Sequence, residues 1–393
     1  MLKIAGFIFL FLGVFSCNIM DEEAHFNSDE SSSIPIFYLD SVTSSITWDK
    51  KNQVEVCIVE NEDSIKLNGK AKFRGGISSR YYKHSFTLDL DEPKSIGKLP
   101  KRRRWILNAN YIDKTFMRHK LSFDLFNMMH EENIAPSSRY VEVYKNNHYL
   151  GLYVLMERVN DEMLYSYTNA TYPIVFKEPA IFYSSLKSIN EKNVFNQKNP
   201  SVKEKDFNDE IEKIHNLIHF SSDEIFSEQI FLHLDQRNII DWHLILLFSN
   251  NSDGLLKNFY IYKLNELDTY KFALWDYDHS FGRDGDNEMN MLERMIDVKR
   301  ITLFKRLIDL NVNNYNDLLS KRWEILTKSV LKKEVIDSMI LSNKKIIQPY
   351  IEKNNKVWPV TDTTWYFDTN DFYDEVEIMK KYIEKRLPQL NEL

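Results

Sequence analysis

Apolar residues recur with two different periodicities along the chain, and these two patterns together indicate its fold class. From about residue 34 to 160, short alternating runs of apolar and polar residues are separated by polar turns, which is typical of antiparallel strands. From about residue 236 to 393, apolar residues recur at helical spacing. We therefore predict an α+β protein of two lobes, a mostly antiparallel β N-lobe with an inserted helix and a mostly helical C-lobe. A chain of 393 residues is long enough to bury a core in each lobe.

The strand pattern of the N-lobe is interrupted once by a helical one. Residues 115–129 carry apolar side chains near helical spacing and predict the inserted helix, with Asp113 or Thr115 as its cap. The strand pattern then resumes, and we expect a hairpin that turns at Asn146 and Asn147. The helix should therefore lie between two strand-rich parts of one lobe.

Residues 161–235 are less regular and form a predicted insertion or linker between the lobes. Within it, PIVFKEPAIFY (173–183) predicts a hairpin, residues 185–205 a loop rich in lysine and asparagine, and residues 206–220 a helix. No internal repeat occurs in this region or elsewhere in the sequence.

The first 33 residues are not expected to belong to the fold. After Lys3, an apolar run ends at Cys17; it is too short for a permanent membrane span but suits a secretory signal peptide, residues 1–17. The stretch VFSC resembles a bacterial lipobox, which would lipidate Cys17; an ordinary signal peptide is the alternative. Residues 18–33 are acidic and rich in serine, and predict a disordered tether. We expect a secreted lipoprotein, anchored to a membrane through Cys17 at the outer membrane or cell surface.

The overall charge gives no sign of a nucleic-acid partner. The formal net charge is -7, whereas nucleic-acid-binding domains usually carry a clustered basic face. The tight basic run at residues 101–104 precedes an apolar stretch and suits a solvated turn before a strand. We therefore expect protein partners and no nucleic acid.

Two acidic clusters and the hairpin between them are the most informative local feature. The clusters are NNSDGLLKN (250–258) and WDYDHSFG (275–282), joined by two runs rich in aromatic and branched residues. If Lys263 pairs with Lys271, Asn258 faces Asp276 across the hairpin. Opposed residues in an antiparallel pair have Cα atoms roughly 4.5 to 5.5 Å apart, so an amide oxygen and a carboxylate could share one cation there.

The spacing of these residues suits phosphoryl transfer. Asn258 follows Asp253 by five residues, the offset that protein kinases use for the catalytic aspartate and a metal-binding asparagine. Asp276 ends the second predicted strand, Asp278 points the same way, and a Phe-Gly pair follows. Asp253 would accept a proton from a substrate hydroxyl, while Asn258, Asp276 and Asp278 would bind the metal.

Three other interpretations compete with this one. Asp-Gly at 253–254 is a favoured turn pair and needs no chemistry. A calcium loop starting at Asp276 fails in detail, because Phe281 stands where an EF-hand needs glycine and Asn287 where it needs glutamate. A glycosyltransferase metal site also uses an apolar strand that ends in Asp-x-Asp; the absence of an alternating β/α pattern before residue 276 weighs against it without excluding it.

A nucleotide also needs its phosphates bound, and the sequence has no Walker or GxGxxG loop. The candidate cradle is FRGGISSR (73–80), in which Arg74 supplies charge and two glycines permit close backbone approach. Lys83 precedes the next predicted strand and could reach the phosphates. A β-turn followed by an exposed lysine is the structural alternative.

Taken together, these motifs resemble those of the spore-coat-protein-H (CotH) kinase family over nearly the whole chain after residue 34. The resemblance is carried by FRGGISSRYYKHSF, WILNANYIDKTFMRHKLSFDLF, HYLGLYVLMERV, NIIDWHLILLFSNNSDGLLKNFYIY and FALWDYDHSFG. It implies a protein-kinase-like bilobal fold, ATP with Mg²⁺ or Mn²⁺ as cofactors, and transfer of the γ-phosphoryl group to a hydroxyl of a protein substrate.

The same resemblance assigns roles to individual residues. Asp253 matches the catalytic aspartate of the family and Asp276 its metal-binding aspartate. Lys83 falls at the first lysine of a paired-lysine strand, and Glu157 falls in a Tyr-x-x-x-Glu segment that would form the hinge or anchor the nucleotide. Arg118 on the inserted helix would bind phosphate or pair with an acid of the site. A catalytically inactive surface scaffold, or a glycosyl- or nucleotidyltransferase, are the alternative functions.

Overall fold

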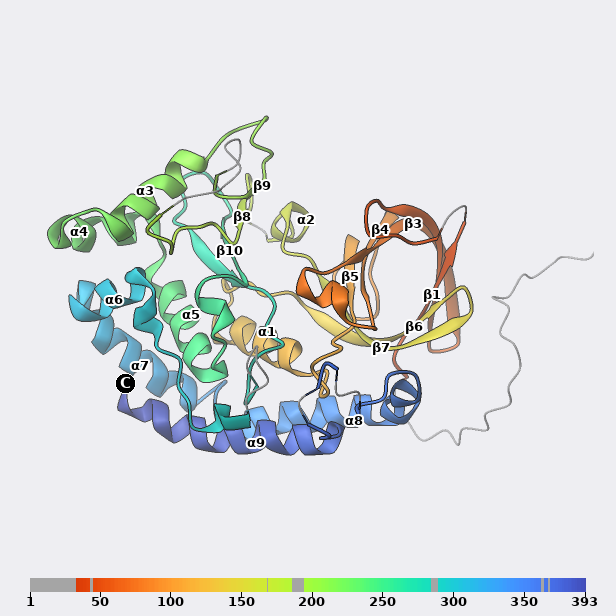
Figure 1. Ribbon diagram of the computed structural model, residues 1–393. Helices are drawn as coiled ribbons and strands as arrows, with labels where there is room; N and C mark the ends of the chain where they lie inside the picture. Colours follow the sequence, from red (N-terminus) through yellow and green to blue (C-terminus); the bar gives the residue numbers. More distant parts are fainter. Residues whose placement is uncertain are drawn as a thin grey trace, which may run out of the picture.

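The computed structural model describes residues 33–42, 45–167, 169–185, 194–283, 289–361, 364–366 and 368–393. It is a mixed α/β molecule with a β-barrel at one end and a helical part at the other, as Figure 1 shows. The predicted contrast between a strand-rich first part and a helical last part is therefore confirmed.

The N-terminal part is a closed seven-stranded barrel. Its strand order is β1-β2-β3-β4-β5-β7-β6, and β6 closes the barrel by pairing in parallel with β1. All other neighbours in the barrel pair antiparallel. The strands are β1 (Ile36–Ser41), β2 (Asn52–Glu60), β3 (Asp63–Arg74), β4 (Ser85–Lys94), β5 (Arg102–Asn108), β6 (Ser138–Lys145) and β7 (His148–Glu157).

The alternation in these strands fills the inside of the barrel with apolar side chains. Phe37, Leu88 and Trp105 belong to a buried cluster that is contributed by β1 to β7. Side chains of successive residues point to opposite faces of a strand, so each strand delivers every second residue to this cluster. The β6–β7 hairpin turns at Asn146 and Asn147, both with positive φ, as the sequence predicts.

Helix α1 (Arg118–Met129) is the predicted insertion, and it lies between β5 and β6 along the chain. Asp113 fixes its first turn, because the Asp113 carboxylate accepts a hydrogen bond from the backbone N–H of Arg118 at 3.0 Å. Thr115 Oγ1 accepts from the N–H of Met117 at 3.1 Å. Both residues proposed as caps therefore satisfy backbone donors at the start of this helix.

A second sheet lies between the barrel and the helices, and it joins two distant parts of the chain (Figure 1). Its strand order is β11-β10-β8-β9, with bounds β8 (Ile174–Lys177), β9 (Gln197–Asn199), β10 (Phe259–Lys263) and β11 (Lys271–Leu274). The hairpin predicted within residues 173–183 is wrong. Strand β8 pairs with β10 and β9, because its residues Ile174, Val175 and Phe176 are fully buried and need partners on both sides.

The helical part surrounds α5, whose residues are buried from Asn238 to Ser249. Other elements of the fold therefore cover this helix on every side. The remaining helices are α2 (Asp161–Leu164), α3 (Asn208–His219), α4 (Asp223–His233), α5 (Gln236–Ser249), α6 (Thr302–Asp309), α7 (Tyr315–Thr327), α8 (Lys333–Val357) and α9 (Phe372–Gln389).

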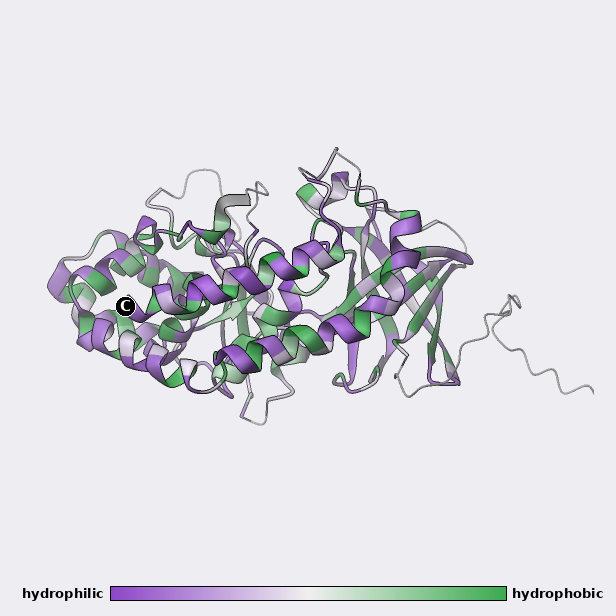
Figure 2. Ribbon diagram, turned by 90° about the horizontal axis from the view of Figure 1, so that it is seen from below, coloured by the Kyte–Doolittle hydropathy of each residue, from purple (hydrophilic) through white to green (hydrophobic). Residues whose placement is uncertain are grey.

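Helix α8 connects the helical part to the barrel. Hydrophilic and hydrophobic residues alternate in bands along both long helices, α8 and α9, as expected of helices that pack on one side (Figure 2). Tyr350 Oη accepts from the N–H of Ile34 at 3.2 Å, and Lys353 Nζ lies 3.1 Å from Glu142 of β6. Among the residues described, no helix combines the length and the apolar character that a membrane span requires.

Candidate active site

The two acidic clusters meet at one end of the second sheet. Strand β11 ends at Leu274, and Asp276 follows it two residues later; strand β10 begins directly after Asn258. Asp276 and Asn258 both have positive φ, 59° and 63°, a conformation that Asp and Asn tolerate better than most residues. The backbone therefore turns away from the sheet at both positions and presents their side chains beyond its end.

The predicted hairpin register is wrong by one residue. Tyr262 pairs with Lys271, and the N–H of Trp275 donates to the carbonyl of Asn258 at 3.2 Å. Lys263 instead extends its side chain to Glu210, with Nζ 2.7 Å from Oε2. Asn258 therefore lies opposite Trp275 and not opposite Asp276.

Asn258 nevertheless contacts the second cluster. Its Nδ2 donates to the backbone carbonyl of Asp276 at 3.1 Å, and its own N–H donates to Glu178 Oε1 at 3.2 Å. Asn258 thus connects the end of β10 to Asp276 and to the residue that follows β8. This arrangement suits a positioning role, while the predicted role as a metal ligand stays a prediction.

Asp253 lies in a short 3-10 helix, η2 (Asp253–Leu255), that follows α5. Helix α5 ends at Asn250, which adopts a left-handed conformation with φ 56° and terminates the helix. The Asp253 side chain is 32% exposed, and its Oδ2 lies 2.9 Å from Lys257 Nζ. The turn interpretation of Asp-Gly is therefore correct for the backbone, and it leaves the carboxylate accessible for chemistry.

Lys257 contacts Asp253 and is influenced by the charge of Asp276. Partial burial disfavours the charged lysine, but the hydrogen bond to Asp253 and the charges of Asp253, Asp276 and Glu178 together raise the pKa of Lys257. The carboxylates of Asp253, the candidate base, and Asp276, the candidate metal ligand, therefore both favour the charged form of Lys257.

His119 completes the second cluster, and the sequence analysis missed it. Its Nε2 lies 3.1 Å from Asp276 Oδ1, and ligand atoms of His119, Asp276 and Asp278 all lie within 4.8 Å of one another. His119 is the second residue of α1 and is far from Asp276 in sequence. Only its place beside Arg118, in a motif that the resemblance already used, could have pointed to it.

The charges in this cluster perturb one another. Partial removal from water would raise the pKa of Asp276, but the hydrogen bond from His119 and the charges of His119, Arg74 and His279 lower it to about 2. Burial, with the neighbouring Asp276 carboxylate, raises the pKa of Asp278. Burial disfavours protonated His119, but the hydrogen bond to Asp276 and the nearby carboxylates raise its pKa.

Two carboxylates and an imidazole suit a divalent cation. Asp276 and Asp278 supply the hard oxygen donors that Mg²⁺ and Mn²⁺ prefer, and a nitrogen donor is compatible with the softer of these ions. A cation would also relieve the repulsion that raises the pKa of Asp278. The side chain of Asp276 is 50% exposed, so a ligand can approach from solvent.

Arg74 lies near this site, and its role in phosphate binding stays a prediction. It ends β3, and its guanidinium carbon lies 5.6 Å from the ring centroid of Trp275. Burial lowers the pKa of Arg74, and the charge of Asp276 opposes that shift. Tyr81, which follows the turn of FRGGISSR, also faces the cluster: burial and the charges of Asp278 and Asp276 raise its pKa to about 12.

The structure places Lys83 in a different environment. Its ammonium group is buried and donates to the carbonyls of Ala109, at 3.0 Å, and Leu152, and to Asn354 Oδ1 at 3.2 Å. Burial without an anionic partner lowers its pKa well below the ordinary lysine value. These contacts tie Lys83 to the barrel and to α8. The alternative of an exposed lysine is wrong, and its role in phosphate binding stays a prediction.

Glu157 and Arg118 are also engaged within the protein. Glu157 is buried at the end of β7, where its Oε1 accepts from Arg102 Nε at 2.8 Å and its Oε2 accepts from the N–H of Ser137 at 3.1 Å. Arg118 pairs with two acids outside the predicted site, and neither of its predicted roles is tested by these contacts. Its Nη1 lies 2.6 Å from Asp113.

Arg118 also connects α1 to the loop of the metal cluster and to α9. Its Nη2 lies 3.0 Å from Glu375 of α9, and its Nε donates to the carbonyl of Ser280 at 2.9 Å. Arg283 contacts the same Glu375 carboxylate. This buried network fixes the segment that carries Asp276 and Asp278 against two helices.

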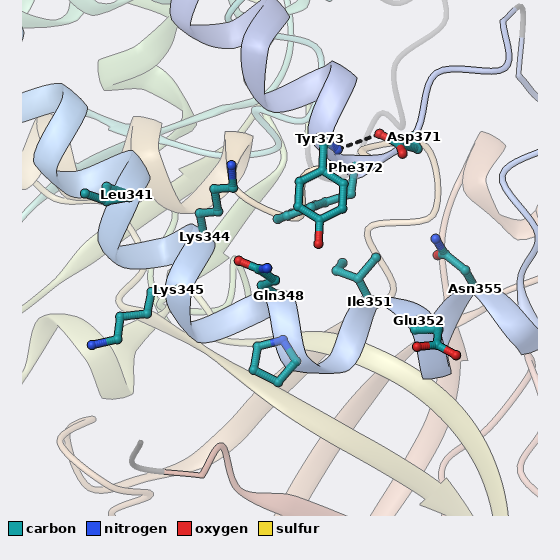
Figure 3. A pocket seen from close by; sticks show the side chains of 11 residues that line it. Leu341, Lys344, Lys345, Gln348, Ile351, Glu352, Asn355, Asp371, Phe372 and Tyr373 are labelled. Atoms are coloured by element: carbon teal, nitrogen blue, oxygen red, sulfur yellow. Dashed lines mark hydrogen bonds between the residues drawn. The ribbon is translucent and has the colours of Figure 1, made fainter. Parts of the chain in front are cut away.

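A separate groove of about 980 Å³ runs along α8 and the start of α9 (Figure 3). Lys344, Gln348 and Tyr373 line it, and the ammonium of Lys344 lies 5.3 Å from the ring centroid of Tyr373. None of the site residues predicted from the sequence lines this groove. The groove and the acidic cluster are therefore built from different residues.

Comparison with known protein families shows the class to which this protein belongs. The family model described as CotH kinase protein matches residues 71–390, and the chain belongs to this family. Among curated proteins, the chain is similar to the inner spore coat protein H of Bacillus subtilis (strain 168). The two are 25% identical over 337 residues, which cover 81% of this chain and 85% of the relative.

Proposed function

We propose that this protein is a metal-dependent phosphotransferase of the CotH kinase type, which transfers the γ-phosphoryl group of ATP to a protein hydroxyl. The observation that supports this most is the meeting of His119, Asp276 and Asp278 at the sheet end. Asp253 and Asp276 both favour the charged form of Lys257. Membership of the family supports the same reaction class.

The proposed division of roles follows the positions of the side chains at the sheet end. Asp276, Asp278 and His119 would bind Mg²⁺ or Mn²⁺, which would neutralise charge on the phosphates. Asp253 would accept the proton of a Ser, Thr or Tyr hydroxyl while that oxygen bonds to the γ-phosphorus and the bond to the β-phosphate oxygen breaks, releasing ADP. Asn258 would position Asp276 through its hydrogen bond to the Asp276 carbonyl.

A location outside the cytoplasm fits both the sequence and the relative. The relative is named as an inner spore coat protein, which supports a surface or extracellular location for this chain. Cys17, the proposed lipidation site, and the tether lie outside the described residues. Labelling the expressed chain with a radioactive fatty acid, with Cys17→Ser as the control, would test the anchor; equal labelling of both chains would refute it.

A non-catalytic binding protein is the second candidate. The contacts of Lys83 favour this candidate. The ammonium of Lys83 donates to three oxygens of the protein and is therefore poorly placed to contact a nucleotide.

Transfer of label from γ-³²P-ATP to protein substrates, or to the chain itself, distinguishes the two candidates. The wild-type chain should transfer label only with Mg²⁺ or Mn²⁺, and Asp253→Asn should reduce transfer about 1,000-fold because proton acceptance and positioning are lost together. Asp317→Asn, on the exposed side of α7, is the matched control. Equal transfer by wild type and Asp253→Asn would end the proposal.

A further inference from the structure

We propose that Lys177, with Arg74, forms an anion site on the ring of Trp275 that binds the phosphates of the nucleotide. This inference rests on the proposed function for the identity of the ligand, and it adds a residue from the insertion, 161–235. The insertion would then be part of the active site.

Both cations lie at the same aromatic ring. The ammonium of Lys177 lies 5.9 Å from the ring centroid of Trp275, and the guanidinium carbon of Arg74 lies 5.6 Å from it. Both distances fall within the range of cation–π attraction. Trp275 is buried and directly precedes Asp276, so the ring fixes two positive groups beside the metal cluster.

The register of the second sheet explains why Lys177 reaches this place. Lys177 ends β8 and pairs with Tyr260 of β10, and the Tyr260 ring packs edge-on against Trp275 at 5.5 Å. Strands β8 and β11 flank β10 on opposite sides, and both end at the sheet end that carries Asp276. The pairing of β8 with β10 therefore delivers a lysine from the insertion to the site.

The charges around Trp275 favour a polyanion. Arg74 and Lys177 bring two positive charges to the ring, and the charge of Arg158 lowers the pKa of Arg74, after the larger effect of burial. Two acids face them: Glu178 lies 3.8 Å from Lys177 Nζ, and Asp276 lies near Arg74. Because a metal would neutralise Asp276, the remaining excess is positive.

Lys177 is also more available to a ligand than Lys83. Its side chain is 29% exposed, and its ion pair with Glu178 is long, so the ammonium can exchange this contact for a phosphate oxygen. Lys83 is buried and donates to three oxygens of the protein. We therefore assign phosphate binding to Lys177 of β8 and not to Lys83.

Calorimetric titration of the full chain with ATP and with tripolyphosphate, each with Mn²⁺, tests the site. Lys177→Met should weaken the binding of both ligands about 10-fold, the loss expected for one charge-assisted hydrogen bond, whereas Lys177→Arg should largely preserve it. Adenosine, which carries no phosphate, should bind Lys177→Met and wild type equally. Lys345→Met, an exposed lysine of the α8 groove, is the matched control.

The outcomes separate this inference from the proposed function. If wild type binds ATP and Lys177→Met binds it equally well, the anion site is wrong and the proposed function stands. If wild type binds tripolyphosphate through Lys177 but transfers no phosphoryl group, the anion site stands and the kinase proposal fails. If wild type binds neither ligand, both are wrong.

Discussion

The molecule positions its charged groups in two contrasting ways. In the network of Arg118, Arg283 and Glu375, and around Lys83, the cations are buried and their partners are groups of the protein. At the end of the second sheet, the side chains of Asp276 and Asp253 stay partly exposed. Removing one partner of a buried ion pair strongly destabilises a fold, whereas an exposed and mutually perturbed cluster is available to a ligand.

This contrast separates scaffold residues from site residues more clearly than residue type does. Lys83 and Lys177 are both lysines close to strand ends, yet Lys83 is buried whereas the side chain of Lys177 is 29% exposed. Substitutions in the buried group should therefore change stability, and substitutions at the sheet end should change metal or nucleotide binding. Variants of the two groups of residues therefore test whether buried and exposed charges differ in this way.

The largest effect is expected at the sheet end. Asp276→Asn keeps the shape of the side chain but removes its charge, so phosphoryl transfer should fall about 1,000-fold with no loss of thermal stability. Label transfer and a thermal melt of the same preparation would measure both. If the variant lost activity only because it unfolds at a lower temperature, Asp276 would be a residue that stabilises the fold and not a site residue.

The next largest effect is expected in the buried network. Glu375→Gln leaves Arg118 and Arg283 without one of their anionic partners, and the free energy of unfolding should fall by about 3 kcal/mol. Urea denaturation would measure it. Glu377→Gln, on the exposed side of the same helix, is the control and should change stability by less than about 0.5 kcal/mol. Similar losses for the two variants would remove the distinction.

Lys83→Met should cost stability without affecting ligand binding. The variant removes the ammonium donor from two carbonyls and from Asn354 Oδ1, which keeps the N–H of Leu152, and we expect a loss of about 2 kcal/mol. The affinity for ATP, measured by calorimetry on the folded protein, should match that of wild type. A large loss of affinity at unchanged stability would restore the phosphate-binding role that the sequence predicts.

The sequence predicted much of the fold because its signals are local. Alternating runs predicted the strands of the barrel, and helical spacing predicted α1; Met117 is its N-cap, while Asp113 and Thr115 accept from backbone N–H groups at its start. Closure of the barrel by the parallel β1–β6 pair was not predicted, because no local pattern reports a contact between segments so far apart.

The parts of the site that were missed depend on such distant contacts. Lys263 forms an ion pair with Glu210 of α3, and His119 reaches Asp276 from a different lobe of the predicted fold. Lys177 reaches Trp275 only because β8 joins β10. The acidic residues Asp253 and Asp276 could be singled out in advance, since their motifs are contiguous and their spacing matches a known chemistry.

The smallest effect separates direct metal binding from simple packing at His119. Gln at this position keeps a polar side chain but loses the imidazole donor, so the affinity for Mn²⁺ should fall about 10-fold, as for other ligands and their immediate partners. Calorimetric titration with MnCl₂ would measure it, with His148→Gln as the exposed control. His119 Nδ1 is buried and has no hydrogen-bond partner within the described residues. A histidine that served packing alone would pay the cost of this unpaired nitrogen without a compensating contact. Unchanged Mn²⁺ affinity in His119→Gln would leave Asp276 and Asp278 as the only protein ligands of this cluster and would make His119 a hydrogen-bond partner alone.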